Sequence, residues 1–145
     1  MARLPAAQEN AGLNAMFVPS TTYYLALYTT DPSTTGASGE VTGGSYARQA
    51  IAFGSASSGS QASTNAQNFT GMPVESGGVP YFGLFTTVSG GTYLGGGTTT
   101  GLSGAISAGS TISFAIGAVT TSLSYGRSAR VLGISRWNCY SPCAG

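Results

Sequence analysis

The chain has 145 residues, a hydrophobic fraction of 41% and only nine charged side chains, five basic and four acidic. It contains no lysine and no histidine, the residues that supply most general bases, amine nucleophiles and nitrogen metal ligands, so we expect no catalytic residue, no metal and no cofactor. Five scattered arginines and the lack of an apolar run of about 18 residues also argue against nucleic-acid binding and a membrane span.

The first twenty residues differ from the rest and are expected to form an N-terminal arm. Residues 6–17 predict a short helix, in which Leu13, Met16 and Phe17 share one face. Pro19 ends the segment. The residues before it lack the apolar run of a secretory signal peptide, so we expect the chain to be made and used without export by that route.

Strand patterns begin after this arm. Residues 21–30 are rich in aromatic and β-branched side chains, and an Asp-Pro turn closes them. Alternation over residues 46–53 predicts a second strand with one apolar face. Residues 54–66 are almost all small and polar, which predicts a flexible surface excursion, and a short strand is expected near residues 68–70.

The second half of the chain predicts at least one hairpin. Residues 79–88 and 92–94 flank a Ser-Gly-Gly loop of suitable length. A loop of glycine and threonine is expected from residue 95 to 104, and residues 111–124 predict two strands separated at Gly117. The number and spacing of strands predict an all-β fold, an antiparallel β-sandwich or jelly roll with a short N-terminal helix and a C-terminal extension.

Three parts are therefore expected: the arm over residues 1–20, a β-sandwich domain over 21–124 and an extension over 125–145. The extension gathers three of the five arginines with apolar and aromatic residues, a mixture enriched at protein interfaces. It can be a last strand that completes the sandwich, but we favour a segment that docks on a neighbour. Its expected contact residues are Arg127, Arg130, Val131, Leu132, Ile134, Arg136, Trp137 and Tyr140.

Arg48 lies in an otherwise apolar strand and needs a partner if it is buried. Glu40 is the nearest carboxylate by sequence, so we predict a structural ion pair between the two, with an intersubunit contact as the alternative. A glycosidase-like pair of Asp31 and Glu40 is disfavoured, because Asp31 is better explained as a residue that begins a proline turn.

Cys139 and Cys143 are the only cysteines. Two cysteines without histidine cannot complete a zinc site. A local disulfide across the intervening Pro142, two free thiols, and a bridge to a neighbouring subunit all remain open from the sequence.

Ordered motifs along the chain resemble a known family. They are Leu25–Pro32, Gly39–Val41, Gly43–Gly44, Tyr46–Arg48, Tyr81–Phe85, Ala108–Ile112 with Phe114, and Gly117–Val119. Over residues 7–124 they are similar to small structural proteins of tailed bacteriophages, often labelled tail fibre-like. Members of that family often carry histidine where this chain has Tyr28, but the resemblance implies no activity that the change would remove.

The resemblance implies a non-enzymatic component of the virion, made in the host cytoplasm and placed on the particle surface. We favour a capsid decoration, or cement, protein that bridges subunits of the major capsid protein, because the chain is compact and has no long stalk. The alternative is a tail-fibre, tail-tip or collar module that contacts the host surface. In either position we expect other virion proteins as partners and a homo-oligomer, with a trimer as one option.

Overall fold

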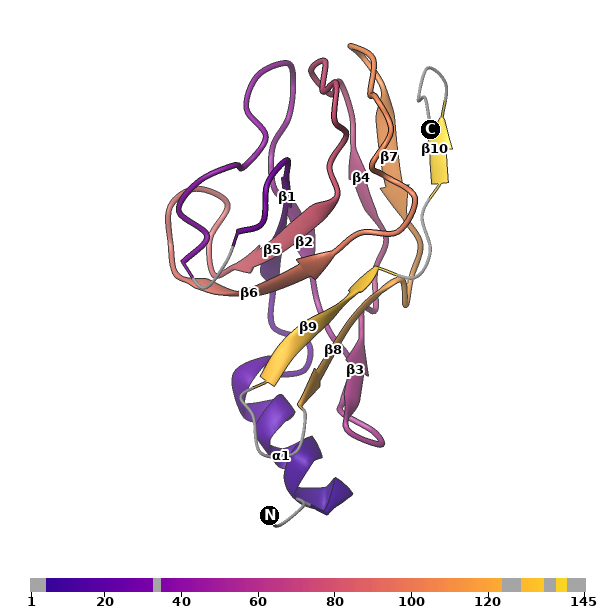
Figure 1. The fold of residues 1–145 in the computed structure, drawn as a ribbon. Helices are drawn as coiled ribbons and strands as arrows, with labels where there is room; N and C mark the ends of the chain where they lie inside the picture. Colours follow the sequence, from indigo (N-terminus) through magenta and orange to yellow (C-terminus); the bar gives the residue numbers. More distant parts are fainter. Residues whose placement is uncertain (1–4, 33–34, 124–128, 135–137, 141–145) are drawn as a thin grey trace.

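The computed structural model describes residues 5–32, 35–123, 129–134 and 138–140. This part of the chain holds one short helix and ten strands, arranged in three antiparallel sheets (Figure 1). The predicted all-β antiparallel fold with a short N-terminal helix is therefore confirmed. The elements are α1 (Ala6–Met16), β1 (Tyr23–Tyr28), β2 (Gln49–Ile51), β3 (Ser60–Ala62), β4 (Gln67–Phe69), β5 (Tyr81–Phe85), β6 (Tyr93–Thr98), β7 (Thr111–Phe114), β8 (Val119–Leu123), β9 (Ala129–Ile134) and β10 (Asn138–Tyr140).

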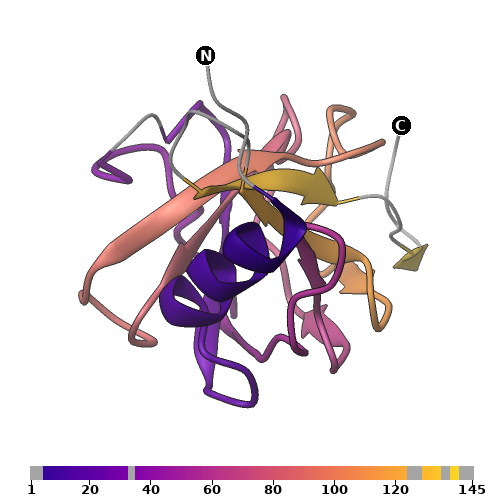
Figure 2. The same cartoon turned by 90° about the horizontal axis from the view of Figure 1, so that it is seen from below.

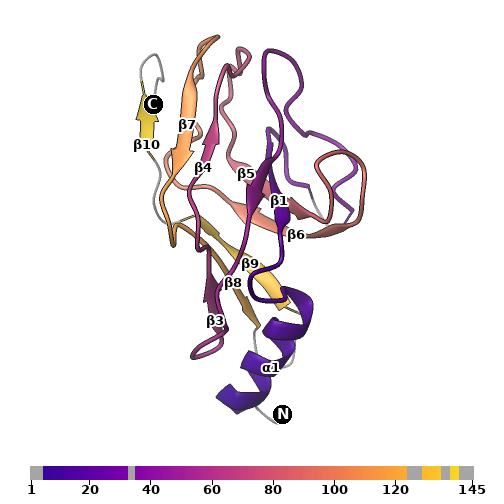
Figure 3. The same cartoon turned by 180° about the vertical axis from the view of Figure 1, so that it is seen from behind.

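The three sheets surround a shared core. Their strand orders are β2-β1-β5-β6, β10-β7-β4 and β3-β8-β9. The sheets meet where β2 lies beside β4 and where β6 lies beside β9 (Figures 1 and 3). Alternation along β1 sends Leu25 and Leu27 into the main core, where they join Phe69, Phe82 and Phe114 from the other strands. No helix in the described ranges is long and apolar enough to cross a bilayer.

Helix α1 lies at one end of the molecule, and Figure 2, viewed from that end, shows it crossing the sheets. Leu13 and Phe17 are buried as their shared face predicts, whereas Met16 is 43% exposed. Polar contacts supply the rest of the docking. The Asn14 Oδ1 atom accepts hydrogen bonds from the backbone N–H of Ala56 at 2.9 Å and from Gln61 Nε2 at 3.3 Å. An isolated helix of this length is marginal in water, so these contacts hold it in place.

The expectation of a flexible surface excursion over residues 54–66 is wrong. The segment contains β3, which pairs with β8, and its Gln61 is 1% exposed. Gln61 Nε2 also donates to the carbonyl oxygens of Phe17 at 2.8 Å and Gly54 at 3.0 Å. The small and polar residues of this segment misled the prediction, because a polar side chain such as Gln61 can be buried when hydrogen-bond partners satisfy its amide group.

The expected loop over residues 95–104 is also wrong in its first part, because β6 continues to Thr98. Gly95, Gly96 and Gly97 pair with residues of β5. A Cβ atom at Gly96 would collide with the carbonyl oxygen of Phe82. Glycine is therefore required here by the close approach of the two strands and does not mark a loop.

The C-terminal residues pair with strands of their own chain. The backbone of β9 runs antiparallel to β8, and β10 runs antiparallel to β7. The backbone of these two strands thus follows the alternative in which the segment completes the sheets. Among the expected contact residues, Arg127, Arg136 and Trp137 lie outside the described residues, as does Cys143, so the expected interface and disulfide stay predictions.

Candidate functional site

The sheet β2-β1-β5-β6 carries a second cluster on the face opposite the main core. Ala26, Tyr28 and Phe85 are buried there, and Tyr81 and Tyr93 pack against them. The period of two along β1 and β5 places these side chains on this face, away from Leu25 and Leu84.

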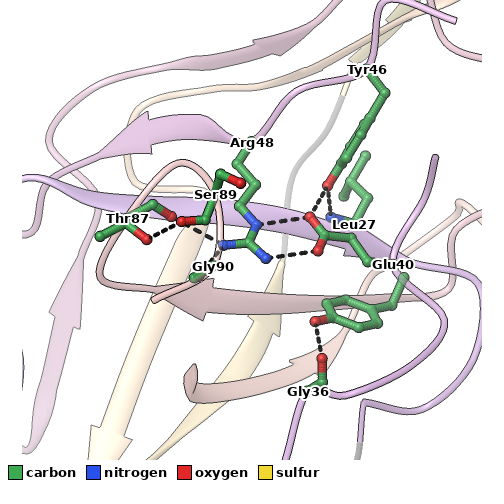
Figure 4. Close-up of polar contacts among 9 residues, drawn as sticks. Leu27, Gly36, Glu40, Tyr46, Arg48, Thr87, Ser89 and Gly90 are labelled. Carbon is green, nitrogen blue, oxygen red and sulfur yellow. Dashed lines mark hydrogen bonds and ion pairs between the residues drawn. The ribbon is translucent and has the colours of Figure 1, made fainter. Parts of the chain in front are cut away.

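Arg48, just before β2, reaches across this cluster toward the loop that joins β5 and β6 (Figure 4). Its Nε atom donates to Glu40 Oε2 and its Nη2 atom donates to Glu40 Oε1, both at 2.8 Å. Its Nη1 atom donates to the carbonyl oxygens of Thr87 at 3.1 Å and Gly90 at 2.8 Å. The guanidinium carbon lies 3.6 Å from the centre of the Phe85 ring. This combines a bidentate ion pair with a cation–π contact.

The structure thus brings Arg48 and Glu40 together within one chain. The Arg48 side chain is 9% exposed and that of Glu40 is 24% exposed. The hydrogen bond with Glu40 is the main cause that raises the pKa of Arg48 above its ordinary value, and burial opposes it. Most of the Arg48 donors are therefore committed to groups of the same chain, which favours a structural role over ligand binding.

Tyr46 joins this ion pair to β1. Its hydroxyl donates to Glu40 Oε2 at 3.1 Å and accepts the backbone N–H of Leu27 at 2.9 Å. Burial, with the nearby Glu40 charge as a smaller cause, raises the pKa of Tyr46 far above its ordinary value. The phenol therefore keeps its proton and continues to donate to Glu40 at any physiological pH.

Tyr28 holds the loop before Glu40 in the same way. Its ring stacks parallel to Phe85, with the centroids 6.5 Å apart, and its hydroxyl donates to the Gly36 carbonyl oxygen at 2.8 Å. Burial is the main cause that raises the pKa of Tyr28 to about 12, and the Glu40 charge adds to it. Gly36 has a φ of +63°, and a Cβ atom there would lie 2.5 Å from the Tyr93 ring, so both space and backbone conformation require glycine.

The arrangement ties two loops to the sheet through hydrogen bonds and one ion pair. Both oxygens of Glu40 accept hydrogen bonds from Arg48 or Tyr46 of the same chain. Within the described ranges, no three His, Cys, Asp or Glu side chains gather in a way that could hold a metal ion.

Sequence reasoning missed Tyr46, Phe85 and the two loop carbonyls. Tyr46 and Arg48 are two residues apart on a predicted strand, which places them on one face, so the hydrogen bond that each makes to Glu40 had a signal in the sequence. The carbonyls of Thr87 and Gly90 had none, because any residue carries a carbonyl.

The chain is thus an antiparallel β-sheet module in which one ion pair and its hydrogen bonds tie two loops to the sheet. A family model described as "Podophage GP4 fiber I protein gp80" matches residues 6–122, so the chain belongs to this family of phage fibre proteins. The resemblance to tailed-phage structural proteins is confirmed. The family description favours the fibre alternative over the capsid-decoration reading. A search of curated proteins gave no match.

Proposed function

We propose that this chain is a folded module of a podophage fibre and that it works by assembly with other virion proteins, without catalysis. The observation that supports this most strongly is the family match, which spans nearly the whole of the described core. The Arg48 cluster agrees with it, because a fibre module must hold its loops in a fixed shape while it makes contacts outside the chain.

The same proposal assigns an outward contact face to two loops. Residues 35–39 and 86–92 lie together over the aromatic cluster, where Tyr28 and Arg48 bind their carbonyl groups. Val88, in the second loop, is 54% exposed. Loops held on a rigid scaffold are the usual carriers of binding function, so this face is the candidate contact with a host surface or with the next fibre component.

The segment over residues 54–66, which contains β3, is less suited to an outward contact than these two loops. Asn10 and Asn14 of α1 accept hydrogen bonds from its backbone at Gly59 and Ala56, both at 2.9 Å. This segment is therefore occupied in holding the helix.

Copy number tests the proposal against the capsid-decoration reading. Quantitative mass spectrometry of purified virions, with the major capsid protein as internal reference, is expected to find a small number of copies per particle. A copy number comparable to that of the major capsid protein would overturn the fibre assignment and support decoration. Light scattering of the purified chain, after size-exclusion chromatography, tests the expected homo-oligomer, with a trimer as the first state to look for.

A further inference from the structure

Edge strands pose a particular problem for this chain. An edge strand presents unpaired N–H and C=O groups that can pair with another molecule, and natural proteins often block this with lysine or other charges. This chain has no lysine and only nine charged residues. Its sheet edges must therefore be protected by other means.

The edge of β2 is covered by an asparagine side chain. Asn65 Oδ1 accepts the backbone N–H of Ala52 at 2.9 Å, and Asn65 Nδ2 donates to the carbonyl oxygen of Ala50 at 2.9 Å. The backbone N–H of Thr64 donates to the Ala52 carbonyl oxygen at 2.9 Å. Together these groups imitate a neighbouring strand, so the edge has few free groups to offer another molecule.

The edge of β3 is covered by the backbone that precedes it. Gly54 N–H donates to the Ala62 carbonyl oxygen at 3.0 Å, and Ser57 and Ser60 exchange two backbone hydrogen bonds of 2.8 and 3.0 Å. Two edges are thus closed by the chain itself, one with a side chain and one with a turn.

β7 and β8 are the central strands of their sheets, and one side of each is paired with residues that follow the family region. The family match ends at residue 122, near the end of β8. On their other sides, β7 pairs with β4 and β8 pairs with β3. Among the described residues, β10 and β9, from beyond the match, occupy the remaining sides, and β9 also lies beside β6 (Figures 1 and 3).

We infer that residues 129–134 and 138–140, here named the C-terminal cover, shield a strand-accepting surface on β7 and β8 through which copies of this chain would otherwise join. The surface recognises backbone groups of an extended strand, so its partner when uncovered is a strand of a second copy. A net charge of +1 gives little repulsion to prevent that contact. This inference does not rest on the position of the protein in the virion.

The test opens the β8 edge in the full chain. Successive N–H groups of a strand point to opposite sides, so Arg130→Pro with Val131→Pro removes an N–H that faces β8. The matched control, Arg130→Ala with Val131→Ala, shortens the same side chains and keeps the backbone donors. Size-exclusion chromatography with light scattering measures the mass of both variants and of the unaltered chain over a dilution series.

The proline variant is expected to gain mass over the alanine control as its concentration rises, and the alanine control shows how much of any change comes from the shortened side chains alone. A synthetic peptide with the sequence of residues 127–141 is expected to reverse that gain, and a scrambled peptide to have no effect. Equal masses for the proline and alanine variants at every concentration would overturn the inference, as would a gain that the peptide does not reverse.

Hydrogen exchange distinguishes an opened edge from a lost fold. Amides of β1 and β5 are expected to keep their protection in the proline variant, while those of β8 lose it. Asn138→Pro with Cys139→Pro removes an N–H of the three-residue β10 that faces β7 by the same alternation, and this second variant is expected to deprotect β7. If both variants lose protection in β1 and β5, the segment belongs to the folding core and the inference fails.

Discussion

Replacing Arg48 by Met removes the group that joins three segments on the outer face of the sheet. The substitution keeps a long apolar stem over Phe85 but deletes two hydrogen bonds to Glu40 and two to loop carbonyls. Each such bond contributes about 0.5–1.5 kcal/mol net. Since Glu40 is 24% exposed, water replaces part of the loss, and we expect the free energy of unfolding to fall by about 2–3 kcal/mol.

The assay is urea unfolding of four proteins: the unaltered chain, Arg48→Met, Glu40→Gln and the double variant. The coupling energy from this cycle is expected to be about 1–2 kcal/mol. Arg48→Lys is the matched control, because it keeps the charge but cannot form the two-point contact, and it should lose most of the same stability. A loss below about 0.5 kcal/mol for Arg48→Met, or full retention by Arg48→Lys, would refute the reasoning.

Three further predictions concern buried groups. Stability should hold up to about pH 10 and fall above it, because the unfolded chain releases the Tyr46 proton that the folded chain retains. The urea midpoint between about pH 9 and 11 should therefore decline less steeply for Tyr46→Phe than for the control Tyr24→Phe. Equal slopes for the two variants would contradict this prediction. Gly83→Ala should lower the stability measured by thermal unfolding by about 2 kcal/mol, because the added Cβ would lie 3.0 Å from two tyrosine rings. The control Gly77→Ala, with open space around it, should change stability by less than about 0.5 kcal/mol. Similar values for both variants would count against the packing argument. Gln61→Ala should cost about 3 kcal/mol and speed hydrogen exchange in α1, since it leaves the buried carbonyl oxygen of Phe17 and the partly buried one of Gly54 without their donor. Unchanged exchange would show that the helix is held by other contacts.

The sequence predicted those parts of the fold that follow from local pattern. The sequence pattern shows the aromatic run at β1 and the alternation that buries Ile51 and Phe53. It also shows the break between two strands at Gly117, whose φ is positive. β3 was missed because its burial depends on Gln61, a polar residue whose partners come from α1 and from a distant strand. Tertiary contacts of this kind leave no periodic signal.

The candidate site likewise has contacts that the sequence predicts and contacts that depend on tertiary structure. Arg48 and Glu40 are eight residues apart and carry opposite charge in a chain with few charges, so their pairing is a natural prediction. Their attachment to the loop that joins β5 and β6 depends on backbone carbonyls and on the Phe85 ring, which become neighbours only through sheet pairing. The position on the virion depends on partner surfaces outside the chain, and neither composition nor strand pattern encodes them.

Immunogold labelling of intact virions tests the central claim most directly. Antibodies raised against the folded chain, followed by electron microscopy, are expected to place gold particles on the fibres and leave the head unlabelled. Labelling spread evenly over the head would contradict the fibre assignment and return the protein to the capsid surface.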